Sequence, residues 1–353
     1  TQVAHVERPG ANFEPRGHDL MRAPRFWSRE VAPKSREAAP LLRFLLSPLA
    51  WTYAEITRRK IRAADALDVS ATVICIGNLT AGGVGKSPVV AGLRKRIQRA
   101  LGVRVATLSR GYKGRLKGPL RVDPTIHSAI DVGDEPMMLA SSGESWIGAD
   151  RAAAGQAMSA DGVDVILMDD GHQNPGLAKD LSIIVVDATI GFGNGYVIPK
   201  GPLRETVADG LQRAGAIIVM GDGGEPVILH DTGLPLYRGK ILASETPNAG
   251  RYVAFAGIGR PEKFFDTLTE LGVDLRDSVP FPDHHSFSDP DMRYLRRLAK
   301  EPGARLITTE IDYARMPEAM REDLTFLPIE AQFDRETDLD NLLADVINAR
   351  RHG

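Results

Sequence analysis

Residues 72–88 of the chain read TVICIGNLTAGGVGKSP, and this stretch decides the fold. It opens with apolar and β-branched residues typical of a buried strand, and glycines then precede Lys86 and Ser87. Glycines allow a turn in which several backbone N–H groups point inward, and the N-terminus of a following helix adds positive potential. The stretch therefore predicts a P-loop between a strand that ends near Gly77 and a helix that begins at or just after Lys86.

The predicted loop gives the chain a nucleotide site. Lys86 is expected to bridge the outer phosphates of ATP, and Ser87 is expected to offer its hydroxyl to Mg²⁺. The ATP-binding residues are Thr80, Ala81, Gly82, Gly83, Val84, Gly85, Lys86 and Ser87. Thr80 stands where the general pattern has its first glycine, but strand, loop, lysine, hydroxyl and helix follow in the required order. The favoured function class is a P-loop phosphotransferase.

Apolar runs alternate with helical patterns from residue 72 onward. Short, nearly continuous β-branched runs are typical of buried parallel strands, and they occur at 72–77, 103–109, 163–168, 181–187 and 216–220. They predict a doubly wound, mostly parallel α/β core. After about residue 222, Gly- and Pro-rich connections lead into a further set of strands and helices, which predicts a second, smaller α/β lobe. The expected division is a disordered extension over 1–25, an amphipathic helical segment over 26–68, the kinase core over 69–222 and the smaller lobe over 223–353.

The segment from Pro40 to Arg62 has the most uneven distribution of apolar and charged residues in the chain. Apolar and aromatic residues crowd its first half, and Pro48 is expected to break it into two helical pieces. The second half carries a cationic cluster of Arg58, Arg59, Lys60 and Arg62. Two interpretations remain open: a helix packed on the core, or an anchor whose apolar face enters a membrane surface while the cations meet anionic lipid.

Composition excludes several other classes of protein. The formal net charge of -2 indicates no global attraction to nucleic acid. The single cysteine, Cys75, rules out a disulfide framework and fits a reducing cytoplasm. We find no run of about 18 uncharged apolar residues that would span a membrane, and no export signal.

Carboxylates and arginines elsewhere suit phosphoryl transfer. Asp169 and Asp170 follow an apolar run, where a P-loop protein places the group that holds Mg²⁺ or its waters. Asp134 lies in an acidic turn and could accept the proton of a hydroxyl, and His284 could orient such a carboxylate. Arg110 and Arg204 are candidates for phosphate contacts, because a guanidinium matches phosphate oxygens. Taken singly, each of these residues could equally be an ordinary surface or turn residue.

In this order, the motifs resemble the tetraacyldisaccharide 4'-kinase family, the lipid A 4'-kinases of Gram-negative bacteria. The segments that carry the resemblance are 77–88, 108–112, 132–136, 169–173, 201–205 and 283–284. The family's loop has a small hydroxyl residue at the position of Thr80. The resemblance implies transfer of the ATP γ-phosphate to the 4'-hydroxyl of a lipid A disaccharide 1-phosphate, with Mg²⁺, at the cytoplasmic face of the inner membrane.

The resemblance also assigns roles to single residues. It implies that Asp134 is the catalytic base and His284 its partner, that Lys86 and Ser87 serve the nucleotide, and that Asp169, Asp170 and Glu205 surround the metal. Three positions depart from the family pattern: His172, Asn174 and Ile311. The first two are expected to affect packing, while Ile311 puts in doubt a substrate role for Thr308–Glu310.

A hypothesis from another class remains at this point. A membrane-peripheral regulatory ATPase would share the doubly wound core and the basic amphipathic segment. Such a switch does not need the pair of Asp134 and His284, whereas a kinase acting on a hydroxyl does.

Overall fold

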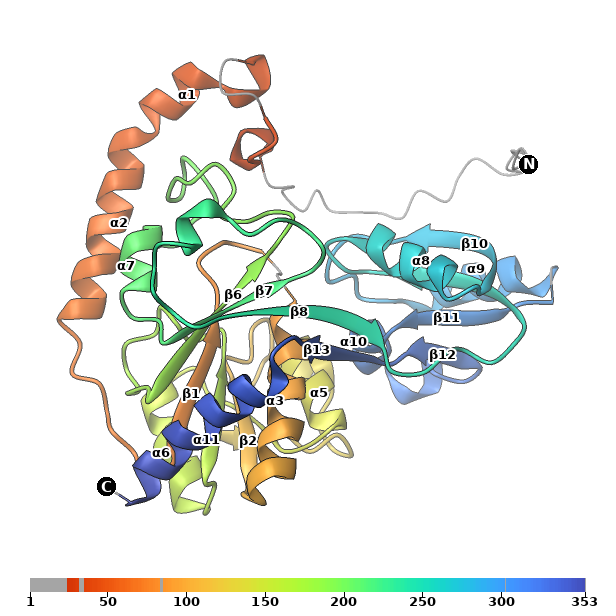
Figure 1. Cartoon of the computed structure of the whole chain (residues 1–353). Helices are drawn as coiled ribbons and strands as arrows, with labels where there is room; N and C mark the ends of the chain where they lie inside the picture. Colours follow the sequence, from red (N-terminus) through yellow and green to blue (C-terminus); the bar gives the residue numbers. More distant parts are fainter. Residues whose placement is uncertain (1–23, 32–34, 83–84, 302, 353) are drawn as a thin grey trace.

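The computed structural model describes residues 24–31, 35–82, 85–301 and 303–352 of the 353-residue chain (Figure 1). Within these residues, a nine-stranded sheet forms the framework of a larger lobe and a four-stranded sheet that of a smaller lobe, drawn at the right of Figure 1. A helical arm, coloured orange, stands on the opposite side of the larger lobe. The predicted α/β class with a mostly parallel sheet is confirmed.

The larger sheet has the strand order β13-β8-β7-β6-β1-β5-β2-β4-β3 among the described residues. Its strands are β1 (Thr72–Gly77), β2 (Val105–Ser109), β3 (Leu120–Arg121), β4 (Ser145–Ile147), β5 (Val165–Asp169), β6 (Leu181–Asp187), β7 (Ala216–Met220), β8 (Leu236–Ala243) and β13 (Ile329–Phe333). The helices that accompany it are α3 (Lys86–Leu101), α4 (Ala129–Val132), α5 (Asp134–Ser141), α6 (Arg151–Ala160), α7 (Val207–Leu211) and α11 (Glu336–His352).

The smaller sheet has the order β10-β9-β11-β12. Its strands are β9 (Arg251–Ala256), β10 (Asp274–Pro280), β11 (Arg305–Thr309) and β12 (Leu324–Leu327), with helices α8 (Pro261–Glu270), α9 (Asp289–Lys300) and α10 (Glu310–Arg315). Short 3₁₀ turns lie at Arg25–Trp27, Arg36–Ala38, Val227–Leu229 and Glu318–Met320.

Strand β1 lies in the middle of the larger sheet and carries the loop. It runs parallel to β5 and β6 on its two sides, and all of its residues are buried. Both faces of such a strand are covered, which explains its uninterrupted apolar sequence. From β1 the chain crosses through α3 to β2, whereas β6 and β7 extend the sheet on the other side. Ligands of α/β sheets bind where the strand order reverses in this way, at the carboxyl ends of the strands.

Helix α3 follows the loop and packs along the sheet. Gly85 caps its N-terminus with a φ of 75°, a left-handed conformation that suits glycine. Along one face it buries Val89, Val90, Leu93 and Ile97 in the core cluster that also includes β1 and β5 side chains. The helix thereby holds Lys86 and Ser87 in its first turn against a rigid support.

The lobe boundary differs from the one expected at residue 222. Strands β8 and β13 pair with each other and extend the larger sheet beside β7, although both come after that residue. Helix α11 also returns to the larger lobe, where Leu339, Leu343 and Ile347 join its core cluster. The smaller sheet itself therefore spans only 251–327. Strand periodicity does not show which sheet a strand joins, because that depends on partners distant in sequence.

The two lobes meet at helix α10, which packs against α5 of the larger lobe. Arg260 at the start of α8 also pairs with Asp187 at the end of β6. The carboxyl end of the larger sheet thus faces residues of the smaller lobe.

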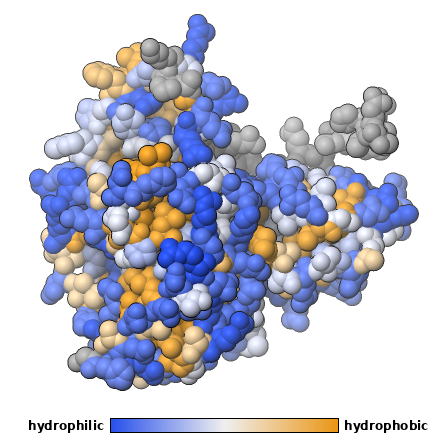
Figure 2. Space-filling model, in the orientation of Figure 1, coloured by the Kyte–Doolittle hydropathy of each residue, from blue (hydrophilic) through white to orange (hydrophobic). Residues whose placement is uncertain are grey.

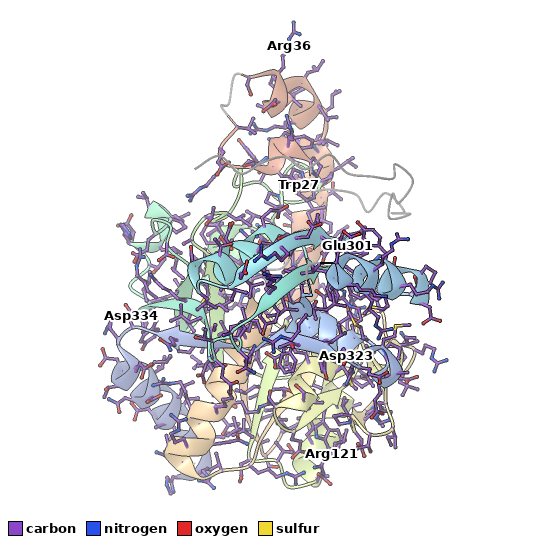
Figure 3. The ribbon with its side chains drawn as sticks, turned by 90° about the vertical axis from the view of Figure 1, so that its right-hand side faces the viewer. Trp27, Arg36, Arg121, Glu301, Asp323 and Asp334 are labelled. Carbon is purple, nitrogen blue, oxygen red and sulfur yellow. The ribbon has the colours of Figure 1, made fainter. Side chains whose placement is uncertain are left out.

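The arm consists of α1 (Pro40–Leu45) and α2 (Ser47–Arg62), and the break between them falls just before Pro48, as predicted. Polar contacts hold the arm to the larger lobe. Arg58 forms an ion pair with Asp209 at 2.9 Å, and Lys200 donates to Ser47 at 3.0 Å. Figure 3 places Arg36 at the outer tip of this part of the molecule. Most of the expected extension, residues 1–23, lies outside the described residues.

Large apolar side chains of the arm are exposed. Leu41, Phe44, Leu49, Trp51 and Ile56 are each 60–73% exposed. Figure 2 shows hydrophobic surface on the upper part of the arm. A helix packed on the core would bury these side chains, so the packed interpretation fails for them. None of the helices in the described ranges has the length and apolar character needed to cross a membrane.

Candidate active site

The phosphate loop leaves β1 at the carboxyl edge of the sheet and lies beside a second loop, Pro202–Arg204. Thr80 forms a bridge with Leu203, and the Ala81 N–H donates to the Pro202 carbonyl at 2.7 Å. Gly82 and Gly85 have φ values of 108° and 75°, which favour glycine. Gly83 and Val84 lie outside the described residues. The loop that carries Arg204 and Glu205 is therefore fixed against the nucleotide loop.

Lys86 points back across the loop to two oxygen atoms. Its Nζ lies 3.1 Å from Asn78 Oδ1 and 3.3 Å from Asp170 Oδ1. Arg204 reaches the same Asp170 oxygen at 2.7 Å. Burial opposes ionisation of Asp170, but the charges of Lys86 and Arg204 outweigh it and hold the pKa of Asp170 below its usual value. Two cations thus converge where the outer phosphates of a nucleotide would lie.

Asp169 ends β5 and is almost completely buried. Burial raises its pKa to about 7, because few polar groups replace the lost water. Its Oδ1 is buried without a hydrogen-bond partner among the described residues. An orphaned carboxylate oxygen beside Lys86 and Asp170 is suited to a cation that arrives with a ligand.

Asp134 and His284 meet across the two lobes. Asp134 is the first residue of α5, and its Oδ2 lies 2.9 Å from Nδ1 of His284, which follows β10. The hydrogen bond with Asp134 raises the pKa of His284. For Asp134, burial raises the pKa, but His284 and Arg315 outweigh it and lower the pKa overall. The carboxylate is therefore held in its ionised form.

Glu135 connects this pair to the phosphate loop, and sequence reasoning missed it. Burial raises its pKa, and its charge interacts with His284 and Asp134 on one side and with Lys86 and Asp170 on the other. The candidate base and the P-loop lysine therefore belong to one site. Its sequence signals were the acidic turn that it shares with Asp134 and the motif 132–136, neither of which gave it a role.

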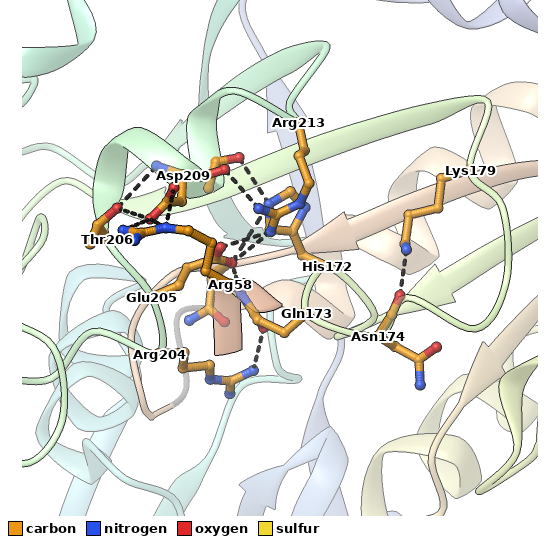
Figure 4. Close-up of polar contacts among 12 residues, drawn as sticks. Arg58, His172, Gln173, Asn174, Lys179, Arg204, Glu205, Thr206, Asp209 and Arg213 are labelled. Atoms are coloured by element: carbon orange, nitrogen blue, oxygen red, sulfur yellow. Dashed lines mark hydrogen bonds and ion pairs between the residues drawn. The ribbon is translucent and has the colours of Figure 1, made fainter. Parts of the chain in front are cut away.

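Glu205 lies in a network that supports the loop (Figure 4). Arg213 donates to both of its carboxylate oxygens at 2.8 Å. Gln173 links Glu205 to the Asn78 carbonyl, at 2.9 Å in each case. Glu205 thus forms an ion pair with Arg213, which follows the end of α7, and its place in the metal set stays a prediction.

The two candidate arginines differ in their surroundings. Arg204 contacts Asp170, whereas Arg110 is exposed at the end of β2. Arg151 is an arginine that sequence reasoning missed. It is buried at the start of α6, burial lowers its pKa to about 10, and its charge interacts with those of Arg110, Asp169 and Asp170. A buried cation here adds positive potential at the same edge of the sheet.

Thr308–Glu310 has a structural role in this chain. Thr308 donates to the Phe255 carbonyl at 2.8 Å, and Thr309 caps α10 by accepting from the Asp312 N–H. Ile311 packs against the core cluster of the larger lobe. This segment therefore shapes the lobe contact.

His172 and Asn174 affect packing, as expected. Asn174 accepts from the Gly176 N–H at 3.0 Å and from Lys179 through its carbonyl. His172 is buried with its Nε2 3.0 Å from the Gly210 carbonyl, while its Nδ1 has no partner among the described residues. A Cβ on Gly77 would lie only 2.5 Å from the His172 Cβ, so this glycine in β1 makes room for the histidine.

Replacing His172 with phenylalanine is expected to remove an acid sensitivity. Burial lowers the pKa of His172 to about 3, so below pH 6.5 the unfolded chain binds a proton that the folded chain does not. Wild-type stability is therefore lost as the pH falls from 6.5 toward 3. Between pH 7 and pH 5 the wild type should lose about 2 kcal/mol of unfolding free energy more than His172→Phe. Urea unfolding at both pH values measures this, and the exposed His352→Gln should behave as the wild type; parallel losses in all three proteins would contradict the assignment.

The comparisons with known proteins point to one family. A family model described as tetraacyldisaccharide-1-P 4'-kinase matches residues 42–348. The tetraacyldisaccharide 4'-kinase of Hyphomonas neptunium is 52% identical over 326 residues, which cover 92% of this chain and 98% of that protein. That of Maricaulis maris is 47% identical over 336 residues, 93% of this chain and 97% of that protein.

A solved structure has the same fold. The crystal structure of LpxK from Aquifex aeolicus in complex with ATP is similar with a TM-score of 0.70 and 25% sequence identity. The match covers 87% of this chain and 99% of that one. The chain thus belongs to the tetraacyldisaccharide-1-P 4'-kinase family and is a kinase, as the motifs predict.

Proposed function

We propose that this kinase transfers the γ-phosphate of ATP to the 4'-hydroxyl of a tetraacyldisaccharide 1-phosphate precursor of lipid A. Family membership supports the reaction. The observation that carries the proposal is the contact between Asp134 and His284, with the neighbouring Glu135 interacting electrostatically both with this pair and with Lys86. An alcohol acceptor needs a base at this position. The alternative, a regulatory ATPase, is not favoured, because its water nucleophile does not require this pair.

The residues divide between donor and acceptor. Amides of the loop from Thr80 to Ser87 bind the phosphates. When ATP binds, Lys86 leaves its contact with Asp170 and contacts the outer phosphates instead. Arg204, which shares Asp170 with Lys86, can make the same exchange, and Arg110 reaches phosphate from the exposed end of β2. Asp134 accepts the proton of the sugar hydroxyl as its oxygen attacks in line, and His284 orients the carboxylate. Positioning and charge carry most of the catalysis in such a transfer.

The residues present fit a Mg²⁺ ion that binds with ATP. Asp169 offers a buried oxygen without a partner, and Ser87 and Asp170 lie on neighbouring elements of the site. No set of three or more His, Cys, Asp or Glu side chains in the described part of the chain is arranged to hold a metal alone. Mg²⁺ commonly takes one or two carboxylates and completes its shell with water and phosphate oxygens. When bound, it would neutralise charge on the phosphates, while Glu205 supports the loop through Gln173.

Transfer of labelled phosphate from ATP to a purified lipid A disaccharide 1-phosphate tests the proposal. Label should appear in the lipid at its 4'-position, and ATP consumption should depend on the lipid. ATP consumption that needs no lipid and responds to a protein partner would support the regulatory ATPase instead.

We also propose that the arm lies on the cytoplasmic face of the inner membrane, as a peripheral contact. Its large apolar side chains are exposed, and Lys60 and Arg62 are exposed near its end. Arg58 is paired with Asp209, and Arg59 with Glu55, so only part of the expected cationic cluster is available to lipid. An enzyme that takes an acylated substrate from a bilayer gains from lying on its surface.

Replacing Phe44 and Trp51 with serine is expected to release the protein from anionic vesicles. Both side chains are at least 70% exposed, so the change should leave the fold intact. Full burial of one such side chain contributes about 1.5–3 kcal/mol. The loss of either side chain should therefore weaken binding to the vesicles by about tenfold or more. Vesicle flotation measures the partition. Ile126→Ser, which removes an apolar side chain 73% exposed elsewhere on the larger lobe, is the control, and equal flotation of all three proteins would contradict the proposal.

A further inference from the structure

Arg315 is a buried arginine of the smaller lobe that no motif indicated. It is the last residue of α10, and its side chain is 7% exposed. One guanidinium nitrogen donates within its own lobe, to Asp312 at 2.8 Å and to the carbonyls of Gly257 and His285 at 3.1 Å. The guanidinium is therefore held in place before it contacts the larger lobe.

The other guanidinium nitrogen reaches across the lobe boundary. It lies 3.0 Å from Oδ2 of Asp134, the same oxygen that His284 contacts at 2.9 Å. Both cationic partners of the proposed base therefore come from the smaller lobe and meet on one oxygen. We expect Oδ1 to be the oxygen that accepts the proton of the sugar hydroxyl.

We propose that Arg315 is a positioning residue for Asp134, which holds the carboxylate in its ionised form and in the orientation that leaves Oδ1 for the acceptor hydroxyl. This inference rests on the proposed role of Asp134 as the base. An arginine is suited to the task because its planar fork bonds several oxygens at once and stays charged at every working pH. His284 loses its charge when it deprotonates, so only Arg315 keeps a constant positive charge on the base.

The charges around the base act in known directions. An opposite charge within hydrogen-bond distance lowers the pKa of a carboxyl, and Arg315 does so for Asp134. The charged and titratable groups that face Asp134 and its partner are His284 and Asp283 from the loop after β10, Asp312 from α10, Glu135 from α5 itself, and Lys113 from the loop after β2.

The pH dependence of kcat/KM for the lipid substrate tests the inference. Arg315→Met should move the acidic limb upward by about one to three pH units, because Asp134 then protonates more readily. Arg315→Lys keeps a charge and should move the limb by less than half of that shift. The Kd for ATP should stay within about threefold of the wild type in both, since Arg315 contacts the base and not the phosphate loop. The quantity compared is the position of the acidic limb in each variant relative to the wild type. Glu135 is present in all of these proteins, so its own titration affects each of them alike.

Two further variants separate this role from a merely structural one. Arg315→Met removes the cation paired with the buried carboxylate of Asp312, which keeps only neutral donors from Gly257 and Thr309, and this loss could prevent folding. The double variant Arg315→Met with Asp312→Asn removes that charge and should still show an upward shift of the limb, smaller than in the single variant because Asp312 no longer repels ionised Asp134. Arg260→Met removes another ion pair between the lobes, with Asp187, and should keep the wild-type limb.

The outcomes distinguish the inference from the proposed function. A folded Arg315 variant, single or double, whose acidic limb is unmoved overturns the inference, even if its kcat falls at every pH. If Asp134→Asn keeps its turnover, the proposed base is wrong instead. A shifted limb together with an inactive Asp134→Asn supports both.

Discussion

Asp134→Asn is expected to lower kcat by about 10²–10⁴-fold, the usual contribution of a general base. Asparagine keeps the size and one oxygen of the side chain, but it cannot take up the hydroxyl proton. The Kd for ATP should change little, because Asp134 contacts His284 and Arg315 rather than the phosphate loop. Single-turnover transfer to the lipid, with a separate measurement of ATP binding, gives both quantities.

The control for this substitution is Asp283→Asn. Asp283 precedes His284 in the same loop, its side chain is about half exposed, and its carboxylate lies 4.0 Å from His284 Nε2, so the variant removes a neighbouring charge while the contact between Asp134 and His284 stays in place. It should keep most of the wild-type turnover. Equal losses in kcat and in ATP affinity for Asp134→Asn would show that this residue supports the fold of the site, and the assignment as base would then be abandoned.

Lys86→Ala is expected to lower phosphate transfer by at least about 10²–10³-fold, the cost of removing one preorganised group that stabilises charge in the transition state. Its ammonium lies in the first turn of α3, within 3.3 Å of Asp170 and beside Arg204. Alanine leaves the helix intact but removes the cation that would stabilise the negative charge on the phosphate during its transfer. Both ATP binding and transfer should weaken, in contrast to Asp134→Asn.

Lys95→Ala is the matched control on the same helix. Lys95 pairs with Glu330 at 3.6 Å, and the two side chains are 47% and 38% exposed, so solvent screens this ion pair and it contributes little to stability. The variant should bind ATP and transfer phosphate as the wild type does. Nucleotide binding and turnover that survive in Lys86→Ala would refute the P-loop interpretation.

Much of the larger lobe could be predicted because its signals are local. The strand Thr72–Gly77 and the strands at Leu181–Asp187 and Ala216–Met220 have the predicted bounds. Each is a short apolar run between turn residues, and burial on both faces leaves no other pattern for a parallel strand. The helix after the loop begins at Lys86, as predicted, because Gly85 caps it.

The lobe boundary could not be predicted in the same way. Strand β8 reads as the start of a new region, yet it pairs with β7, and β13 joins it from almost 90 residues further along the chain. A strand's own sequence reports that it is buried, but its neighbours are chosen by the packing of the whole sheet.

The sequence by itself determined the phosphate loop, because glycines, lysine, serine and helix start act within a dozen adjacent residues. It also carried the family motifs, which named Asp134 and His284 as partners by resemblance. Only the tertiary structure decided how the site is assembled. Asp134 and His284 are 150 residues apart, Glu135 lies in a motif that gave it no role, and Arg151 and Arg315 joined the site without a motif. The physical reason is that a buried charge is stabilised by whichever opposite charge or dipole the fold brings within hydrogen-bond distance, and sequence spacing does not encode that distance.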